Sequence, residues 1–130
     1  MRAVDTNVLV RLIVDDDPAQ ADAAQRAMVS EPVFVPKTVV LELEWVLRSV
    51  YELSSTTIAT VIEGLLSAAD VLVEDATAIS RAVAWFKDGL DLADALHLAS
   101  SSHAGAFITF DAAMRRRAAA TGVRPPVAAP

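Results

Sequence analysis

Short runs of apolar residues alternate with longer amphipathic runs along the whole chain, and this alternation constrains the fold more than any other feature of the sequence. Two of the short runs, Val33–Val35 and Val71–Val73, consist only of apolar residues and are rich in valine, as strands buried on both faces are. The longer runs repeat their apolar residues at helical spacing. This order of elements indicates an α/β fold with a central parallel sheet of four or five short strands and helices on both faces.

The pattern also predicts the bounds of the elements. Strands are expected at residues 3–4, 33–35, 71–73, 107–109 and, as a short edge strand, 123–124. Helices are expected at residues 6–14, 18–30, 37–51, 54–69, 75–86, from 91 to the turn at Gly105, and 111–122. Because no repeat, linker or change of composition interrupts the 130 residues, we expect one domain over residues 1–130.

Composition narrows the class of protein. The sequence has no cysteine, which excludes disulfides, thiolate zinc sites and a cysteine nucleophile. No apolar stretch approaches the ~18–20 residues of a membrane span, and Asp5 interrupts the place of a signal peptide, so we expect a cytoplasmic protein without membrane contact. The formal net charge of −6 excludes a broad basic face that holds nucleic acid by counterion release alone. It leaves open a nuclease whose carboxylates hold cations.

Three acids stand where a strand or a loop gives way to a helix, namely Asp5, Asp94 and Asp111. In an open parallel sheet, ligands bind beyond the carboxyl ends of the strands, so such acids can converge although they lie far apart in the sequence. The same positions suit helix capping, because Asp is a favoured N-cap residue. Asp75 also follows a strand and opens a helix, so placement alone does not distinguish a ligand from a cap.

Two further choices stay open on spacing alone. Asp91 and Asp94 are three residues apart, so one can cap the helix while the other points inward. Glu42 and Glu44 lie inside an apolar helical run, each roughly a quarter turn from the centre of its apolar stripe. Helical spacing does not choose between these two glutamates.

Several converging carboxylates would need a cation. Two unit charges ~5 Å apart repel by about 3 kcal/mol at an effective dielectric constant of ~20. A set of oxygen ligands suits Mg²⁺ or Mn²⁺. Such a cation can lower the pKa of a water molecule, orient it toward a phosphodiester and stabilise the leaving oxygen, so that hydrolysis needs no protein nucleophile.

Four segments in order along the chain, residues 4–9, 41–48, 90–99 and 107–111, resemble the PIN-domain ribonucleases, and among them the VapC-type toxins of bacterial toxin–antitoxin pairs. In that family's pattern, the catalytic and metal-binding acids fall on Asp5, Glu42, Asp94 and Asp111. The supporting positions fall on Thr6, Asn7, Asp91 and Thr109. The resemblance thus selects Glu42 over Glu44, and Asp94 over Asp91.

The resemblance implies a single PIN-like domain with Mg²⁺-dependent endoribonuclease activity and Mn²⁺ as a substitute metal. It implies a toxin that cleaves RNA phosphodiester bonds and is neutralised by a cognate antitoxin. It also implies a homodimer, which the many apolar residues of segment 37–69, among them Trp45 and Tyr51, favour independently. Phe110 departs from the pattern, since a basic or polar residue is common at that position.

Two other functions fit parts of the sequence. One is a catalytically inactive PIN-like protein that dimerises and binds a partner. Retention of four acids disfavours it, because buried carboxylates without a purpose are costly. The other is a carboxylate–metal phosphotransfer domain, such as a phosphatase or a receiver module, which is disfavoured because no second acid lies two residues after Asp5.

A few other residues invite interpretation. His97, three residues after Asp94, suits contact with substrate or metal, but it lies between two leucines, so we expect it in the core. Trp45 and Trp85 lie in apolar helical stripes, and we expect them in the core or at an interface. The basic run at residues 115–117 suits either a solvated helix face or contact with RNA phosphates.

Overall fold

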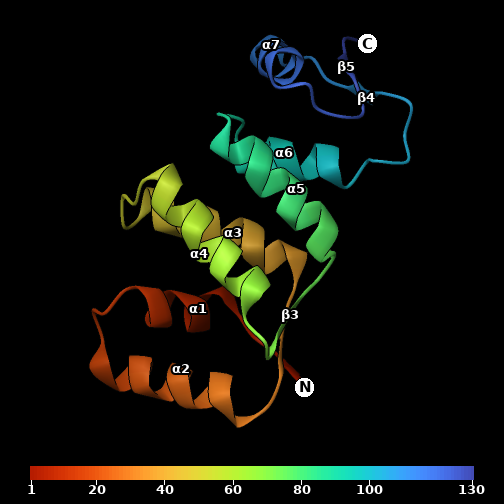
Figure 1. The fold of residues 1–130 in the computed structure, drawn as a ribbon. Helices are drawn as coiled ribbons and strands as arrows, with labels where there is room; N and C mark the ends of the chain where they lie inside the picture. Colours follow the sequence, from red (N-terminus) through yellow and green to blue (C-terminus); the bar gives the residue numbers. More distant parts are fainter. The chain divides into compact units, whose positions relative to one another are not determined.

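The computed structural model describes all 130 residues, as seven helices and five strands (Figure 1). The elements in chain order are β1 (Arg2–Ala3), α1 (Thr6–Ile13), α2 (Pro18–Ser30), β2 (Val33–Val35), α3 (Lys37–Ser49), α4 (Ser55–Ser67), β3 (Val71–Val73), α5 (Ala76–Lys87), α6 (Leu92–Ala99), β4 (Phe107–Ile108), α7 (Ala112–Thr121) and β5 (Val127–Ala128). The chain forms two compact units, a first unit of Met1–Ala76 and a second unit of Thr77–Pro130. None of the seven helices combines the length and apolar character that crossing a membrane requires.

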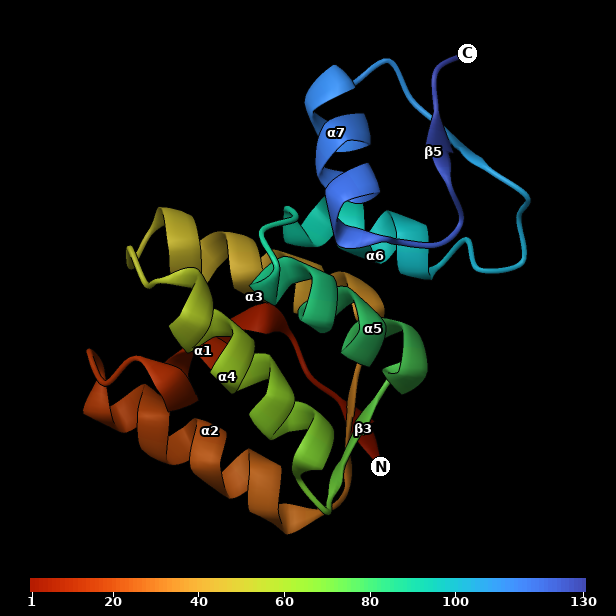
Figure 2. The same ribbon diagram turned by 45° about the horizontal axis from the view of Figure 1, so that its top comes forward.

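The first unit is built on a parallel sheet with the strand order β1-β2-β3 (Figure 2). β2 lies in the middle, and its Phe34 is paired with Ala3 on one side and with Leu72 on the other. Parallel neighbours need a long connection, and here each connection is a pair of helices, first α1 and α2 and then α3 and α4. The predicted α/β class with parallel pairing is confirmed. Instead of one sheet of four or five strands, however, the chain has a three-stranded and a two-stranded sheet.

The helices of the first unit bury their apolar faces at the spacing that the sequence predicts. On α3, Leu43 and Leu47 are fully buried one turn apart, and on α4 the same holds for Ile58 and Ile62. α3 contacts α4, and α4 contacts β3. The expected helical hairpin of segment 37–69 is therefore present, and it carries Glu42 on α3.

The N-terminus of α3 is capped from another element of the first unit. Its own N-cap residue, Pro36, makes no side-chain cap. Instead, the backbone N–H of Lys37 donates to Oε1 of Glu74 at 2.7 Å, and the ammonium of Lys37 lies 2.8 Å from the carboxylate of Asp75. Asp75, expected to open the next helix, thus pairs with α3. The two acids after β3 fix the start of the helix that carries Glu42.

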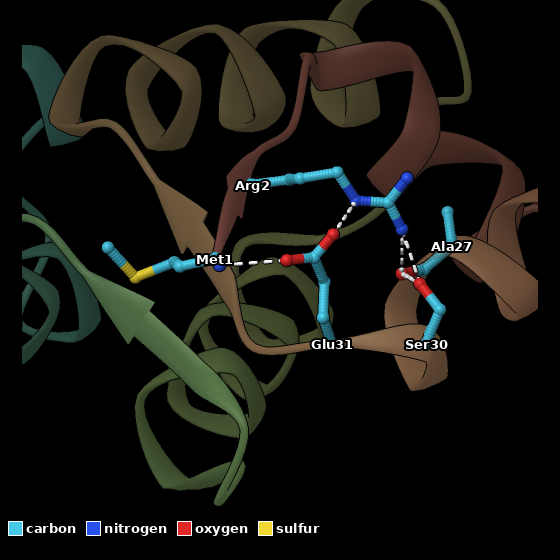
Figure 3. A network of polar contacts seen from close by, with 5 residues as sticks. All are labelled: Met1, Arg2, Ala27, Ser30 and Glu31. Atoms are coloured by element: carbon cyan, nitrogen blue, oxygen red, sulfur yellow. Dashed lines mark hydrogen bonds and ion pairs between the residues drawn. The ribbon is translucent and has the colours of Figure 1, made fainter.

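The start of the chain is tied to the junction between α2 and β2 (Figure 3). The amino group of Met1 lies 2.8 Å from Oε2 of Glu31, and Nε of Arg2 lies 2.6 Å from Oε1 of the same carboxylate. The guanidinium of Arg2 also donates to the hydroxyl of Ser30 and to the carbonyl oxygen of Ala27. The hydrogen bond from the amino group lowers the pKa of Glu31. These contacts hold β1, which leads directly to the first candidate acid.

A second polar cluster ties α1 to α2 and to the end of α3. Arg11 donates to Oε1 of Gln20 and to Oδ1 of Asp16, both at 2.7 Å. The hydroxyl of Tyr51 donates to Oδ2 of Asp16 at 3.2 Å. Burial raises the pKa of Asp16, but the hydrogen bonds from Arg11 and Tyr51 outweigh this effect and lower the pKa overall. These contacts therefore fix the C-terminal end of α1, the helix that begins directly after Asp5.

The second unit contains a parallel pair of strands, in which Phe107 of β4 lies opposite Val127 of β5. α7 connects the two strands and ends at Gly122, as the sequence predicts. The φ angle of Gly122 is 68°, in the left-handed region that glycine adopts without strain, and its N–H donates to the carbonyl oxygen of Ala118.

Two expected bounds in the second unit are wrong. The edge strand expected at residues 123–124 is absent, because the N–H of Val123 bonds to the carbonyl oxygen of Ala118 at the end of α7. The strand forms further on, at Val127–Ala128. α6 ends at Ala99 and not near Gly105, in a serine-rich segment whose hydroxyl groups compete for backbone hydrogen bonds.

We predict that Glu74→Ala lowers the free energy of unfolding by about 0.5–1.5 kcal/mol, because the first N–H of α3 loses its acceptor. Denaturant titration followed by circular dichroism measures the change. Asp70→Ala removes another exposed acid of the same unit and should stay within about 0.5 kcal/mol of the parent protein. Equal losses in the two variants would show that the contact does not stabilise α3.

Candidate active site

Asp5 stands between β1 and α1 and is the N-cap residue of α1. Its backbone is extended, with φ −82° and ψ 160°, yet its side chain accepts no hydrogen bond from the helix. Asp17, at the same position of α2, does cap, since it accepts from the N–H of Gln20 at 3.1 Å. The capping interpretation therefore fails for Asp5, and its exposed carboxylate is available to a ligand.

Thr6, directly after Asp5, is buried at 2% exposure, and its Oγ1 has no hydrogen-bond partner. It is the one buried side-chain polar atom of the chain in this state. Leaving a buried hydroxyl unpaired costs about 1–3 kcal/mol, so native proteins retain few such groups. The uncommitted carboxylate of Asp5 is a hard oxygen donor of the kind that Mg²⁺ prefers, and the fold supplies no partner for the hydroxyl of the residue that follows it.

Asn7 is the second supporting residue of the first unit. Its side chain is exposed in the first turn of α1. It lines a cavity of about 280 Å³ between α1 and α2, together with Arg11 and Gln20. The structure thus places Asn7 at the contact between these two helices.

The structure separates the two glutamates that helical spacing could not. Glu44 is buried at 3% exposure, and its Oε1 lies 2.7 Å from Nε of Arg48, one turn further along α3. Glu42 is exposed and makes no hydrogen bond or ion pair. Because the carboxylate of Glu44 is committed to Arg48, Glu42 is the glutamate of α3 that is free to bind a ligand.

Asp91 and Asp94 also take different roles. Asp91 is the N-cap residue of α6, and its Oδ1 accepts from the N–H groups of Ala93 at 2.9 Å and of Asp94 at 3.3 Å. Asp94 lies in the first helical turn, is half-buried, and has no hydrogen bond to its carboxylate. The cap is therefore Asp91, and the side chain of Asp94 is free.

Three acids of the second unit lie close enough to influence one another. Burial raises the pKa of Asp94, and the charges of Asp91 and Asp111 raise it further. Electrostatic interactions with His97 and Arg117 act in the opposite direction but are weaker. The charge of Asp111 therefore reaches Asp94, while convergence of these two carboxylates on one site stays a prediction.

Asp111 acts as a cap and Thr109 supports it. Oδ1 of Asp111 accepts from the N–H of Met114 at 2.9 Å, so it caps α7. The N–H of Asp111 donates to Oγ1 of Thr109 at 3.0 Å. The capping interpretation thus holds for one oxygen of Asp111, and the other oxygen accepts no hydrogen bond.

The expectation for His97 is wrong, and for Trp45 only an interface remains of the two places expected. His97 is exposed and not in the core, and its ring stacks on Phe107 with the centroids 6.3 Å apart and 12° between the planes. The three-residue spacing from Asp94 already places His97 on the same face of α6, which the two flanking leucines obscured. Trp45 is 55% exposed, so it does not belong to the core, whereas Trp85 is half-buried.

The four candidate acids are divided between the units, with Asp5 and Glu42 in the first and Asp94 and Asp111 in the second. Within neither unit do three or more His, Cys, Asp or Glu side chains form a group that could hold a metal ion. The donors on both sides are carboxylate and hydroxyl oxygens, which suit Mg²⁺ or Mn²⁺. Convergence of the two pairs on one cation stays a prediction.

We predict that Asp94→Asn raises the melting temperature of the metal-free protein at pH 7 by a few degrees. Because the pKa of Asp94 is raised in the folded state, folding stability falls as pH rises above the usual value of 3.8, and ionised Asp94 is unfavourable at neutral pH. The gain should shrink toward pH 4 and disappear below it. Thermal melts in EDTA at several pH values measure it, with Asp22→Asn on α2 as the control. A gain that is independent of pH would contradict this origin.

Comparison with models of known protein families identifies the family of this chain. The family model of the PIN domain matches residues 2–120, which include all four candidate acids. No curated protein matches the chain significantly. The observed α/β class with parallel strands agrees with the family match. Since the match covers most of its length, the chain belongs to the PIN domain family.

Proposed function

We propose that this protein is a Mg²⁺-dependent endoribonuclease and the toxin of a toxin–antitoxin pair. PIN domains are generally metal-dependent nucleases, so the family supports hydrolysis of nucleic acid. The observation that carries the proposal is the uncommitted carboxylate of Asp5 at the N-cap of α1, followed by the unpartnered buried hydroxyl of Thr6. The carboxylate of Asp5 caps no helix and the hydroxyl of Thr6 has no partner, so hydrogen bonding within the fold explains neither group.

The four candidate ligands differ in whether their carboxylate oxygens already accept hydrogen bonds from the backbone. Asp5 and Asp94 are the principal ligands in this proposal, because neither carboxylate caps a helix. Glu42 is exposed and free to complete the site, and Asp111 contributes the oxygen that does not cap α7. A divalent metal held by these acids supplies positive charge at the scissile phosphate and lowers the pKa of a water molecule.

The basic residues of α7 divide into two roles. Arg115 donates to the carbonyl oxygen of Thr109 at 2.8 Å, so it holds the loop before Asp111. Arg116 and Arg117 are exposed, and Arg117 lies near enough to Asp94 to lower its pKa. In a chain with a net charge of −6, these two side chains are suited to contact RNA phosphates beside the acids.

We predict that Asp5→Asn reduces Mg²⁺-dependent cleavage of RNA by about 100-fold or more, because a metal site supplies several kcal/mol of transition-state stabilisation. The variant should melt at or above the temperature of the parent protein, since it removes a charge that no cation balances in the metal-free state. Ca²⁺ should support RNA binding but little turnover, because its coordination is larger and looser.

Gel analysis of 5′-labelled RNA measures the cleavage, and Asp22→Asn on the exposed face of α2 is the matched control. Cleavage in excess EDTA, or cleavage that survives Asp5→Asn combined with Asp94→Asn, would contradict the metal-hydrolysis proposal. Hydrolysis of a phosphomonoester without cleavage of RNA would favour a phosphotransfer domain. An absence of both activities would favour the inactive, partner-binding protein.

The toxin assignment includes two protein partners. Large apolar side chains are exposed on the first unit at Leu12, Val29, Trp45 and Val50. We therefore propose a homodimer that buries helical faces of this unit. The antitoxin should approach the acids with an arginine, whose planar guanidinium pairs with carboxylates. Induction of the protein alone in cells, against Asp5→Asn, with mapping of new RNA 5′ ends reports toxicity and target together.

We predict that sedimentation velocity shows a dimer and that Trp45→Ala weakens the dimer by about 10-fold or more, because exposed tryptophans are frequent interface hot spots. Leu72→Ala, which truncates an equally exposed side chain on β3, should leave the dimer unchanged. A monomer at all concentrations would contradict the dimer, and equal effects of the two variants would contradict the role of Trp45.

A further inference from the structure

Phe110 is the most exposed large apolar side chain of the protein, at 88%. It lies between β4 and α7, directly before Asp111. A ring in this state buries almost no apolar area and adds little to the stability of the fold. Single exposed apolar residues are common, so exposure alone assigns no role to Phe110. Two further observations do.

The first observation is that hydrogen bonds fix the chain on both sides of Phe110. Before it, the N–H of Thr109 donates to the carbonyl oxygen of Ala128 at 3.0 Å, and Arg115 donates to the carbonyl oxygen of Thr109 at 2.8 Å. After it, the N–H of Asp111 donates to the hydroxyl of Thr109 at 3.0 Å. The backbone that carries the exposed ring is therefore fixed, so binding a ligand requires ordering of the side chain alone.

The second observation is the chemistry around the ring. Asp111, directly after Phe110, is a candidate metal ligand, and α7 presents the exposed cations Arg116 and Arg117. Phe107, the other aromatic residue of this region, is already stacked with His97. An exposed aromatic ring in a segment that also carries exposed cations is a combination with which proteins bind single-stranded nucleic acid, since bases stack on the ring and phosphates pair with the cations. The positive charges favour RNA over an apolar protein surface.

We propose that Phe110 is the residue on which an unpaired base of the RNA substrate stacks, next to the phosphate that is cleaved. This inference rests on the proposed ribonuclease function and assigns one residue of its substrate-binding surface. The ring then contributes to binding and not to the chemical step. Because purines have the larger π-face, Phe110 also gives the site a preference for adenine over uracil beside the cut.

The experiment measures binding in Ca²⁺ and cleavage in Mg²⁺ with three oligomers of equal length, oligo(A), oligo(U) and an abasic ribose-phosphate chain. Phe110→Ala should weaken binding of oligo(A) by about 5- to 150-fold and binding of oligo(U) by less, since base–aromatic stacking has this strength. Binding of the abasic chain should not change. In cleavage of oligo(A), KM should rise while kcat stays within about twofold.

Two variants control for other effects of the substitution. Phe110→Tyr keeps an aromatic ring and should retain the affinity for oligo(A), whereas Phe110→Leu keeps only apolar character and should not. Leu72→Ala, at a side chain that is 55% exposed on β3, should bind all three oligomers like the parent protein.

The outcomes separate this inference from the function on which it rests. If the parent protein neither binds nor cleaves the oligomers, the ribonuclease proposal fails and the inference fails with it. If the parent protein cleaves RNA but Phe110→Ala binds oligo(A) as tightly as the parent does, the stacking role alone is wrong. The same holds if the variant loses as much affinity for the abasic chain as for oligo(A). A variant that changes only the sedimentation of the protein would show that Phe110 contacts protein and not RNA.

Discussion

Parallel pairing of very short strands is the constraint on which the rest of this structure depends. β1 has two residues, and β2 and β3 have three each, so the ladder of the first sheet contains few hydrogen bonds. Parallel pairing requires a crossover after each strand, and the buried faces of the crossover helices supply the core that the strands cannot. Each strand of the first sheet therefore ends almost directly before a helix N-terminus, and the candidate acid Asp5 lies at such a junction.

Acids at helix starts are common for reasons unrelated to catalysis, and here hydrogen bonds divide them into two groups. Asp17, Asp91 and Asp111 each accept a backbone N–H, so the fold accounts for them. Asp5 and Asp94 accept none, and the pKa of Asp94 is raised because its charge is unfavourable where it lies. Acids that the fold does not use, in a family of nucleases, are the residues expected to hold a cation.

Much of the fold could be predicted from the sequence because its signals are local. The pattern gave α2 and β2 at their observed bounds, and Gly122 marked the end of α7. What it missed depends on contacts between distant segments. The pairing of Val127–Ala128 with β4 and the ion pair of Asp75 with Lys37 arise from tertiary structure, which no local pattern contains.

The candidate site also depends on contacts that could not be predicted from the sequence. Spacing alone could not choose between Glu42 and Glu44, and only the contact with Arg48 shows which carboxylate is committed. The exposure of His97 likewise follows from how α6 lies in the second unit, although its spacing from Asp94 placed both on one face of the helix. The sequence could indicate residue types and junctions, but their hydrogen-bond partners had to come from the structure.

The central proposal is that Asp5 and Asp94 hold one cation together. Its most direct test is a double-mutant cycle on Mn²⁺ affinity, measured by electron paramagnetic resonance of the free ion, with Asp5→Asn, Asp94→Asn and the double variant. If both carboxylates bind one cation, each single variant loses most of the affinity and the double variant loses little more, because the two effects are coupled. Losses that multiply in the double variant, or single variants that bind Mn²⁺ like the parent protein, would contradict the shared site.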